Sequence, residues 1–187
     1  MYYFSTRDEM IRAIAKPGFR IAELGVFLGQ FAQVLLTTLP KELVLIDPWA
    51  GKVQSGDQDG QNVVVADLDA AYPLLCKHFA QFPNAVVKRG LSTEVLSQYP
   101  DDSFDLVYID ADHSYEGCKA DLEMAYKKVK PGGWITGHDM GCNLLKCKTA
   151  WCFGVEQAVQ EFCARRGQKI TALGLDGCIS WAIQLKK

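Results

Sequence analysis

The chain has 187 residues, of which 49% are hydrophobic and 22% are charged, and its formal net charge at pH 7 is -2. This length and balance suit one globular domain spanning residues 1–187. The small net charge gives no electrostatic attraction to nucleic acid or to an anionic membrane, and no apolar stretch has the length of a bilayer span.

Two features of the sequence bear on the compartment in which the protein works. The first ten residues, MYYFSTRDEM, lack the basic start and apolar centre of a secretory signal. The seven cysteines are irregularly spaced, which fits reduced thiols better than a disulfide framework. Cys142, Cys147 and Cys152 recur every five residues, which does not match the close pairs of structural zinc sites. These features predict a cytoplasmic protein.

The predicted elements alternate between helices and strands along almost the whole chain. In chain order they are helix 6–16, strand 19–26, helix 30–39, strand 42–48, a polar loop 49–62, a helical segment ending at 82, strand 85–90, helix 92–99, strand 104–110, helix 115–129, strand 134–139, helix 154–167, and strands 169–175 and 178–185. Asp176-Gly177 between the last two strands is a strong hairpin signal. The pattern predicts an α/β, Rossmann-like fold: a mostly parallel seven-stranded sheet with helices on both faces and a C-terminal antiparallel hairpin.

The ends of the first two strands carry acidic and glycine residues. In open parallel sheets ligands bind at the carboxyl ends of the strands. Gly25 and Gly29 bracket a tight strand-to-helix turn that follows Glu23, and position 27 is Phe where a dinucleotide motif needs glycine. Asp47 ends the second strand, at the distance expected of a residue that accepts ribose hydroxyls, although an Asp that caps its own turn is the alternative.

The third strand is followed by Leu91 and Ser92, whose loop is a candidate cover for an adenine edge. Ser92 also fits the simpler role of a cap for the next helix, and that role is slightly favoured.

Acidic and histidine residues follow the fourth and fifth strands. Asp110 and His113 come after the fourth strand, and His138 and Asp139 end the fifth. Adjacent parallel strands lie about 4.8 Å apart, so the two aspartates can converge on one point. Such oxygen and nitrogen donors suit Mg²⁺ or a similar divalent ion, although aspartates that only hydrogen-bond a loop backbone remain the alternative.

A family resemblance rests on six segments that occur in a characteristic order: AELGVFLG, LVLIDPW, VVKRG, FDLVYIDADHSYEGCKADL, VKPGGWITGHD and GVEQAVQEF. They resemble the class I S-adenosylmethionine-dependent methyltransferases, and more narrowly methyltransferase family 24, which is related to metal-dependent O-methyltransferases acting on catechols and on macrolide sugars. The likeness covers about residues 20 to 185.

The resemblance implies roles for the residues at the strand ends. Glu23, Gly25 and Gly29 would hold the methionine part of the cofactor, Asp47 its ribose, and Leu91, Ser92 and Asp110 would complete the cofactor site. Asp110, His138 and Asp139 would bind the metal, and His113, in a D-x-x-H pattern, resembles a general base, with Asp110 also catalytic. Two departures are present: Met140 stands where catechol-type relatives have Asn, and His138 stands where sugar-type relatives have an acidic residue.

The sequence therefore predicts methyl transfer from S-adenosyl-L-methionine to a hydroxyl of a small molecule, with Mg²⁺ or another divalent cation as a candidate second cofactor. A non-catalytic S-adenosylmethionine-binding module that serves a partner protein is the alternative, and a nicotinamide-dependent oxidoreductase is disfavoured by Phe27. No nucleic-acid or membrane partner is expected, and a homodimer is left open.

Overall fold

The computed structural model describes residues 1–55, 64–141 and 154–187 of the chain. Its main sheet contains eight of the described strands: β1 (Tyr2–Phe4), β2 (Arg20–Leu24), β3 (Glu42–Asp47), β6 (Ala85–Arg89), β7 (Phe104–Ile109), β8 (Val129–Met140), β9 (Ala172–Gly174) and β10 (Ile179–Gln184). A separate antiparallel pair is formed by β4 (Lys52–Ser55) and β5 (Val64–Asp67). The described helices are α1 (Arg7–Ile14), α2 (Gln30–Leu36), α3 (Leu68–Phe79), α4 (Ser92–Ser97), α5 (Tyr115–Lys128) and α6 (Val155–Arg166).

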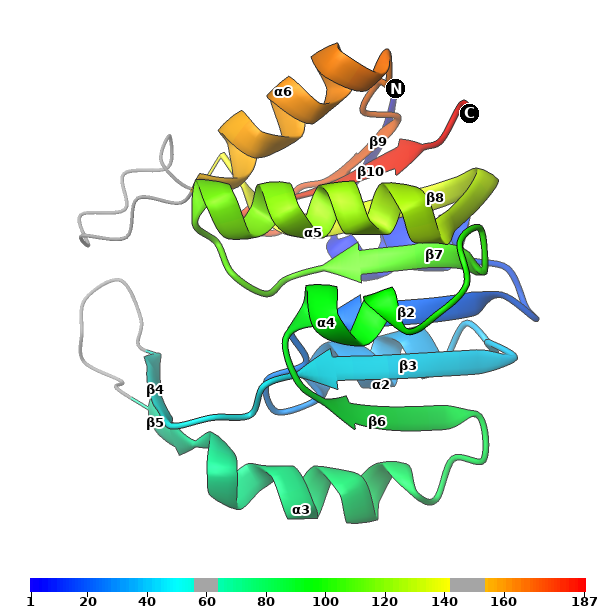
Figure 1. Cartoon of the computed structure of the whole chain (residues 1–187). Coiled ribbons are helices and arrows are strands. Elements are labelled where there is room, and N and C mark those ends of the chain that lie inside the picture. Colours follow the sequence, from blue (N-terminus) through cyan, green and yellow to red (C-terminus); the bar gives the residue numbers. More distant parts are fainter. Residues whose placement is uncertain (56–63, 142–153) are drawn as a thin grey trace.

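The order of the strands in the main sheet is β1-β9-β10-β8-β7-β2-β3-β6 (Figure 1). Strands β6, β3, β2, β7 and β8 are mutually parallel neighbours, whereas β10 runs antiparallel to both β8 and β9. The chain builds outward from β2 through β3 to β6 and then returns to β7 on the other side of β2. The topological switch point, where α/β sheets bind ligands, therefore lies between β2 and β7.

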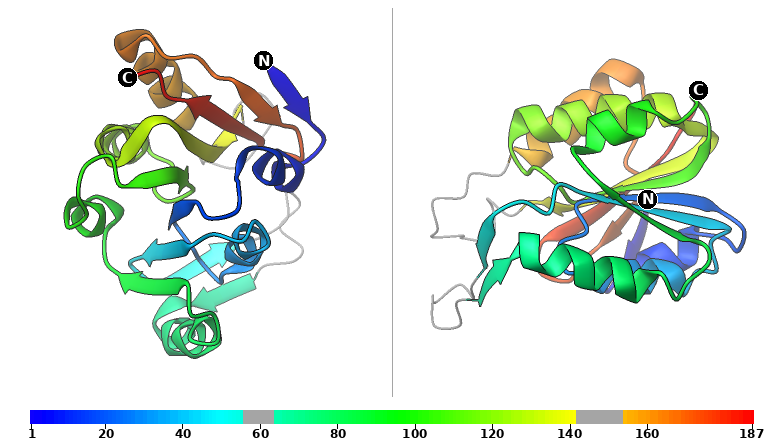
Figure 2. Two further views of the ribbon diagram at one scale, coloured as in Figure 1. Left: turned by 90° about the vertical axis from the view of Figure 1, so that its right-hand side faces the viewer. Right: turned by 60° about the horizontal axis from the view of Figure 1, so that its bottom comes forward.

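Helices cover both faces of this sheet (Figure 2). Alternate residues of each strand point to opposite faces, so Ala22 and Leu24 pack with helices α4, α5 and α6, whereas Ile21 packs with helices α1, α2 and α3. Each face has its own buried cluster, and this two-sided burial explains why the central strands are almost uniformly apolar.

The predicted fold class is confirmed, with two differences. The sheet has one strand more than expected because the exposed segment Tyr2–Phe4 pairs in parallel with β9. The segment expected as a polar loop contributes β4, which pairs with β5 ahead of α3. Neither addition moves the strand ends that form the site.

The described cysteines are of two kinds. Cys76, Cys118 and Cys163 are free thiols, as expected. Cys178 is disulfide-bonded, so the expectation of reduced thiols is wrong at that residue. Cys142, Cys147 and Cys152 lie outside the described residues. None of the helices within the described ranges combines the length and the apolar character that a bilayer span requires.

Candidate functional site

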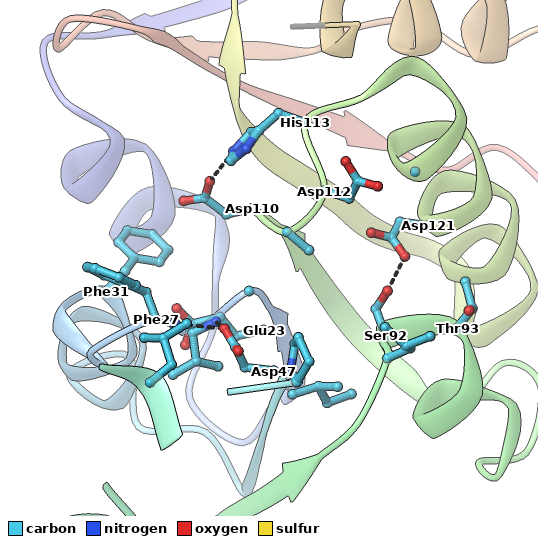
Figure 3. Close-up of a pocket in the computed structure, with 18 of the residues that line it drawn as sticks. Glu23, Phe27, Phe31, Asp47, Ser92, Thr93, Asp110, Asp112, His113 and Asp121 are labelled. Carbon is cyan, nitrogen blue, oxygen red and sulfur yellow. Dashed lines mark hydrogen bonds and ion pairs between the residues drawn. The ribbon is translucent and has the colours of Figure 1, made fainter. Parts of the chain in front are cut away.

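A cavity of about 730 Å³ opens at the carboxyl ends of β2, β3 and β7, at the switch point of the sheet. All but one of the residues predicted to bind the cofactor line it: Glu23, Gly25, Asp47, Leu91, Ser92 and Asp110. Figure 3 shows Glu23 and Asp47 on one side of the cavity and Ser92 and Asp121 on the opposite side. Residues from separate strands thus face one shared space.

The turn between β2 and α2 needs glycine at two positions, because the chain packs closely around them. Gly25 has a φ of +83°, and a Cβ there would lie 2.0 Å from the backbone oxygen of Asp110. Gly29 has a φ of +81°, and its Cβ would lie 3.0 Å from the ring of Phe79. In the structure, neighbouring protein segments approach both glycines. Gly29 is not among the residues that line the cavity.

Asp47 ties together the two loops on its side of the cavity. Its Oδ2 accepts hydrogen bonds of 2.9 Å from the backbone N–H groups of Val26 and Phe27. Its Oδ1 accepts one of 2.7 Å from the N–H of Trp49, whose indole Nε1 donates to the backbone oxygen of Phe27 at 2.8 Å. The turn-capping role is therefore present, and it secures Phe27 and Trp49 at positive φ, a conformation that bulky residues rarely adopt.

Glu23 is a buried carboxyl group in the cavity wall. Its Oε2 has no hydrogen-bond partner among the described residues. Burial raises its pKa well above the usual range, and the charges of Asp110 and Asp47 add to the rise, whereas the charge of Arg7 opposes it. A buried, unpartnered carboxyl oxygen is costly, so this position favours a ligand that supplies a donor or a positive charge.

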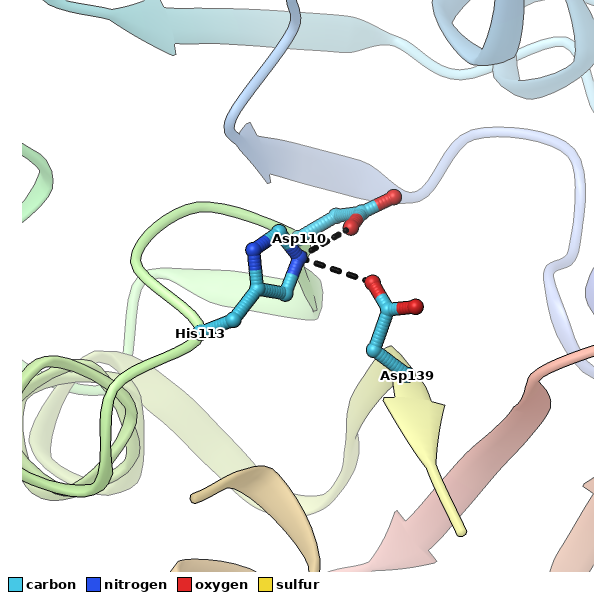
Figure 4. A group of neighbouring side chains, drawn as sticks. All are labelled: Asp110, His113 and Asp139. Atoms are coloured by element: carbon cyan, nitrogen blue, oxygen red, sulfur yellow. Dashed lines mark hydrogen bonds and ion pairs between the residues drawn. The ribbon is translucent and has the colours of Figure 1, made fainter. Parts of the chain in front are cut away.

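Asp110, His113 and Asp139 meet beside the cavity (Figure 4). The Nε2 atom of His113 lies 3.2 Å from Oδ1 of Asp110 and 2.7 Å from Oδ2 of Asp139. Burial opposes the protonation of His113, but the hydrogen bonds to the two carboxylates outweigh it and raise the pKa of the imidazole to about 10. In this arrangement His113 is an imidazolium at neutral pH.

The grouping of these side chains differs from the predicted metal set of Asp110, His138 and Asp139. One ligand atom from each of Asp110, His113 and Asp139 lies within 4.8 Å of the others. His138 instead contacts Asp139 through Nδ1 at 3.2 Å, from the neighbouring position on the chain. The D-x-x-H spacing thus brings His113 between the two aspartates, where His138 was expected.

Two features of the site were not identified from the sequence. Arg7, the first residue of α1, lines the cavity although it lies outside the sequence motifs that predicted the site. Asp121 is buried on α5 and accepts a hydrogen bond from the hydroxyl of Ser92, so Ser92 serves neither as the cap of α4, which is Leu91, nor as a free surface group. Asp121 could have been found, because it interrupts the apolar stripe of Cys118, Leu122 and Ala125. Arg7 could not, since its placement is purely tertiary.

Comparisons with known proteins agree with this arrangement. The sequence matches the family model of a methyltransferase domain, methyltransferase family 24, over residues 22–140. No curated protein sequence matches the chain.

Among solved structures, the O-methyltransferase NovP is similar, with a TM-score of 0.66 and 17% identity over 97% of this chain and 80% of that chain. The N-methyltransferase NodS from Bradyrhizobium japonicum has a TM-score of 0.64 and 14% identity over 97% and 95% of the two chains. An O-methyltransferase from Bacillus cereus in complex with SAH has a TM-score of 0.58 and 18% identity over 95% and 78%.

At such identities the structural likeness shows the fold, and the sequence match shows the family. The matched segment runs from the first strand of the switch point, β2, to the last residue of β8 and includes every predicted site residue. The chain belongs to methyltransferase family 24, a branch of the class I S-adenosylmethionine-dependent methyltransferases.

Proposed function

We propose that the protein transfers the methyl group of S-adenosyl-L-methionine to a hydroxyl oxygen of a small molecule. The observation that carries this proposal is the meeting of Asp110, His113 and Asp139 beside the cavity that holds Glu23 and Asp47. The residues proposed to bind the cofactor and those proposed to bind the methyl acceptor thus lie next to each other at the switch point of the sheet. The O-methyltransferases among the similar structures support the choice of oxygen.

The cavity residues fit the cofactor by charge. When bound, S-adenosylmethionine would supply an electrophilic methyl group on a positively charged sulfur. Glu23, Asp47 and Asp110 give the cavity a negative lining that suits a cationic ligand. Oδ2 of Asp47 already accepts two hydrogen bonds and Oδ1 accepts one, so Oδ1 keeps one lone pair with which it would accept from a ribose hydroxyl.

The acceptor end also fits a divalent metal ion. Asp110, Asp139 and His113 would hold it through two carboxylates and an imidazole, a donor set that suits Mn²⁺ or Zn²⁺ at least as well as Mg²⁺. Such an ion would lower the pKa of an acceptor hydroxyl. Because one ring nitrogen of His113 lies with an oxygen of Asp110 and of Asp139 within 4.8 Å of one another, we favour His113 as a ligand over the general-base role that the sequence indicated.

The alternative of a non-catalytic cofactor-binding module needs the cofactor side alone. Such a module would not need the cluster of Asp110, His113 and Asp139. The presence of this cluster beside the cofactor cavity therefore supports an enzyme. The cytoplasmic location and the homodimer stay predictions.

The test is transfer of a labelled methyl group to panels of catechols, sugars and hydroxylated metabolites, with matched amines, in the presence of Mg²⁺, Mn²⁺, Zn²⁺ or EDTA. We expect a hydroxyl acceptor, activity lost in EDTA and restored by one of the ions, and activity lost in Asp139→Asn. Asp102→Asn, at the opposite end of β7, is the control and should retain activity. Methylation of amines alone would overturn O-methylation, and full activity in EDTA without detectable bound metal would overturn the metal.

A further inference from the structure

The short segment after β7 carries His113, and its path decides which histidine lies between the two aspartates. At its start, the N–H of Asp110 donates to the backbone oxygen of Leu24 at 2.8 Å. At its end, the hydroxyl of Ser114 caps α5 and accepts from the N–H of Gly117 at 3.1 Å. His113 lies between these fixed ends, in a stretch without regular secondary structure, so its position depends on contacts with other elements.

Gly154, the residue that precedes α6, makes such a contact. Its backbone N–H donates to the carbonyl oxygen of His113 at 2.8 Å. This hydrogen bond joins the segment after β7 to the start of α6, two parts of the chain that are far apart in the sequence. The backbone of His113 is therefore tied to α6 as well as to its own neighbours along the chain.

Gly154 approaches the segment so closely that a side chain has no room there. A Cβ on Gly154 would lie 2.3 Å from the backbone nitrogen of Tyr115 and 2.4 Å from its Cα. These are main-chain atoms in the first turn of α5, which cannot swing aside as the end of a flexible side chain can. The φ of Gly154 is -89°, a value open to any residue, so glycine is required here for space and not for conformation.

Side-chain contacts hold α6 against the start of α5. The hydroxyl of Tyr115 donates to Oε2 of Glu161 at 2.6 Å, and Gln157 donates to Oε1 of the same carboxylate at 2.9 Å. Phe162 of α6 and Leu122 of α5 are buried in one apolar cluster. The start of α6 is thus a firm support for the segment that carries His113.

The size of the displacement that a side chain at Gly154 would cause can be compared with what the cluster tolerates. Ordinary van der Waals contact begins at 3.4 Å, so a Cβ there must move one of the two backbones by about 1 Å. Functional side chains have to be held within about 0.5 Å of their working geometry. The Nε2 atom of His113 lies 2.7 Å from Oδ2 of Asp139 and 3.2 Å from Oδ1 of Asp110, an arrangement that such a shift would disrupt (Figure 4).

We propose that Gly154 is a positioning residue: its N–H and its lack of a Cβ hold His113 between Asp110 and Asp139. The use of His113 as a metal ligand rests on the proposed function, whereas the position of its imidazole does not. The inference gives a role to a residue beyond the family-matched segment 22–140.

The first test locates His113 in the absence of metal, by NMR of protein with ¹⁵N-labelled histidine in EDTA. The Nε2–H of His113, which donates to a carboxylate, should give a downfield resonance that exchanges slowly with water and is absent in His113→Asn. We expect this resonance to be lost in Gly154→Ala. If that variant does not fold, Tyr115→Phe decides, since it removes only the bond to Glu161: a faster exchange of the same proton supports the proposal, and an unchanged one overturns it.

Gly133→Ala is the matched control. Gly133 also has no positive φ, and a Cβ there would lie 2.8 Å from the backbone oxygen of Asp105, so the substitution forces a similar collision. Gly133 lies near the start of β8, at the opposite end of the sheet from His113. This variant should keep the resonance.

The second test measures the binding of Mn²⁺ by electron paramagnetic resonance of the free ion. We expect Gly154→Ala to bind Mn²⁺ about 10- to 100-fold more weakly than wild type, the loss typical when the support of a metal ligand is removed. The affinity for S-adenosylhomocysteine should be kept, because Gly154 does not line the cavity.

An unchanged His113 resonance in Gly154→Ala would overturn the inference. So would an equal loss in Gly133→Ala, because the effect would then be a general loss of stability. The outcome is separable from the proposed function: a wild type that shows the resonance but binds no Mn²⁺ would remove the metal, and the NMR comparison would still decide the role of Gly154.

Discussion

Asp47 is a single side chain on which two loops depend. It accepts three backbone N–H groups, from Val26, Phe27 and Trp49, and an asparagine or alanine cannot replace all three bonds. We expect Asp47→Ala to lose both cofactor affinity and stability, by roughly 2–4 kcal/mol of unfolding free energy, because buried donors are left without partners. Urea unfolding and calorimetry with S-adenosylhomocysteine measure both. Weakened binding with unchanged stability would restore the view that Asp47 serves the ribose alone.

The raised pKa of Asp121 makes the stability of the protein depend on pH. Burial raises its pKa from 3.8 to about 6, with Ser92 opposing and Asp112 adding to the rise. The folded state therefore holds a proton more tightly than the unfolded state does. The stability that this group contributes is present below pH 3.8 and is lost as pH rises through about 6.

Asp121→Asn, which keeps an oxygen for Ser92, should consequently be more stable than wild type above pH 6, by roughly 1–3 kcal/mol, with the difference vanishing near pH 4. Urea unfolding from pH 4 to 8 measures it. Asp101→Asn is the contrasting variant, since Lys128 lowers the pKa of Asp101 and its removal should destabilise at neutral pH. Equal pH profiles for wild type and Asp121→Asn would contradict the prediction.

The strand ends named from the sequence meet at one cavity, but the histidine grouped with Asp110 and Asp139 is His113 and not His138. Asp110, His113 and Asp139 stand at strand ends, and that position is encoded locally by where the apolar runs stop. Whether His113 or His138 lies between the aspartates depends on the path of the loop after β7, which no local pattern specifies. Arg7 joins the site through packing against β9, so only the tertiary structure could reveal it.

Two glycines on either side of β2 can be compared directly: Gly18 precedes the strand and Gly25 follows it. Gly25 and Gly18 both have a φ of +83°, but a Cβ at Gly25 would collide with the backbone of Asp110, whereas one at Gly18 meets nothing within 4 Å. We expect Gly18→Ala to cost about 1 kcal/mol, the strain of a left-handed conformation alone, and Gly25→Ala to cost at least about 3 kcal/mol. Thermal unfolding of both variants tests this, and equal losses would show that β7 shifts readily away from the turn.

Elements were predictable where a periodic apolar pattern was strong. Helix α1 was expected over 6–16 and spans Arg7–Ile14, with Thr6 accepting from the N–H of Glu9, and the predicted alternation of strands and helices holds from β2 to β10 except at β4 and β5. Strand β1 escaped prediction because its three residues are mainly exposed and it exists only through its pairing with β9. Strand β4 is a polar segment whose strand form likewise depends on its partner β5.

The whole molecule should respond to a ligand that fills its cavity. A ligand that binds only the folded state at 100 times its Kd stabilises by about 2.7 kcal/mol, which for a domain of this size raises Tm by roughly 5–10 °C. We expect S-adenosylhomocysteine to produce this shift and NAD to produce none, because Phe27 stands where a pyrophosphate needs glycine. Differential scanning fluorimetry measures both, and a comparable shift with NAD would contradict the exclusion of dinucleotides.

The pairing of β1 with β9 has a consequence for a chain that is still being translated. Residues 2–4 have no sheet edge to join until Ala172–Gly174 have left the ribosome, well after the family-matched segment has emerged. Arg7 would therefore reach its place only near the end of synthesis. Trypsin should therefore cleave readily after Arg7 in ribosome-bound chains halted before Ala172, and slowly in chains displayed on a tether beyond Gln184. Equal protection of the shorter chains would mean that the first helix docks without its neighbouring strand.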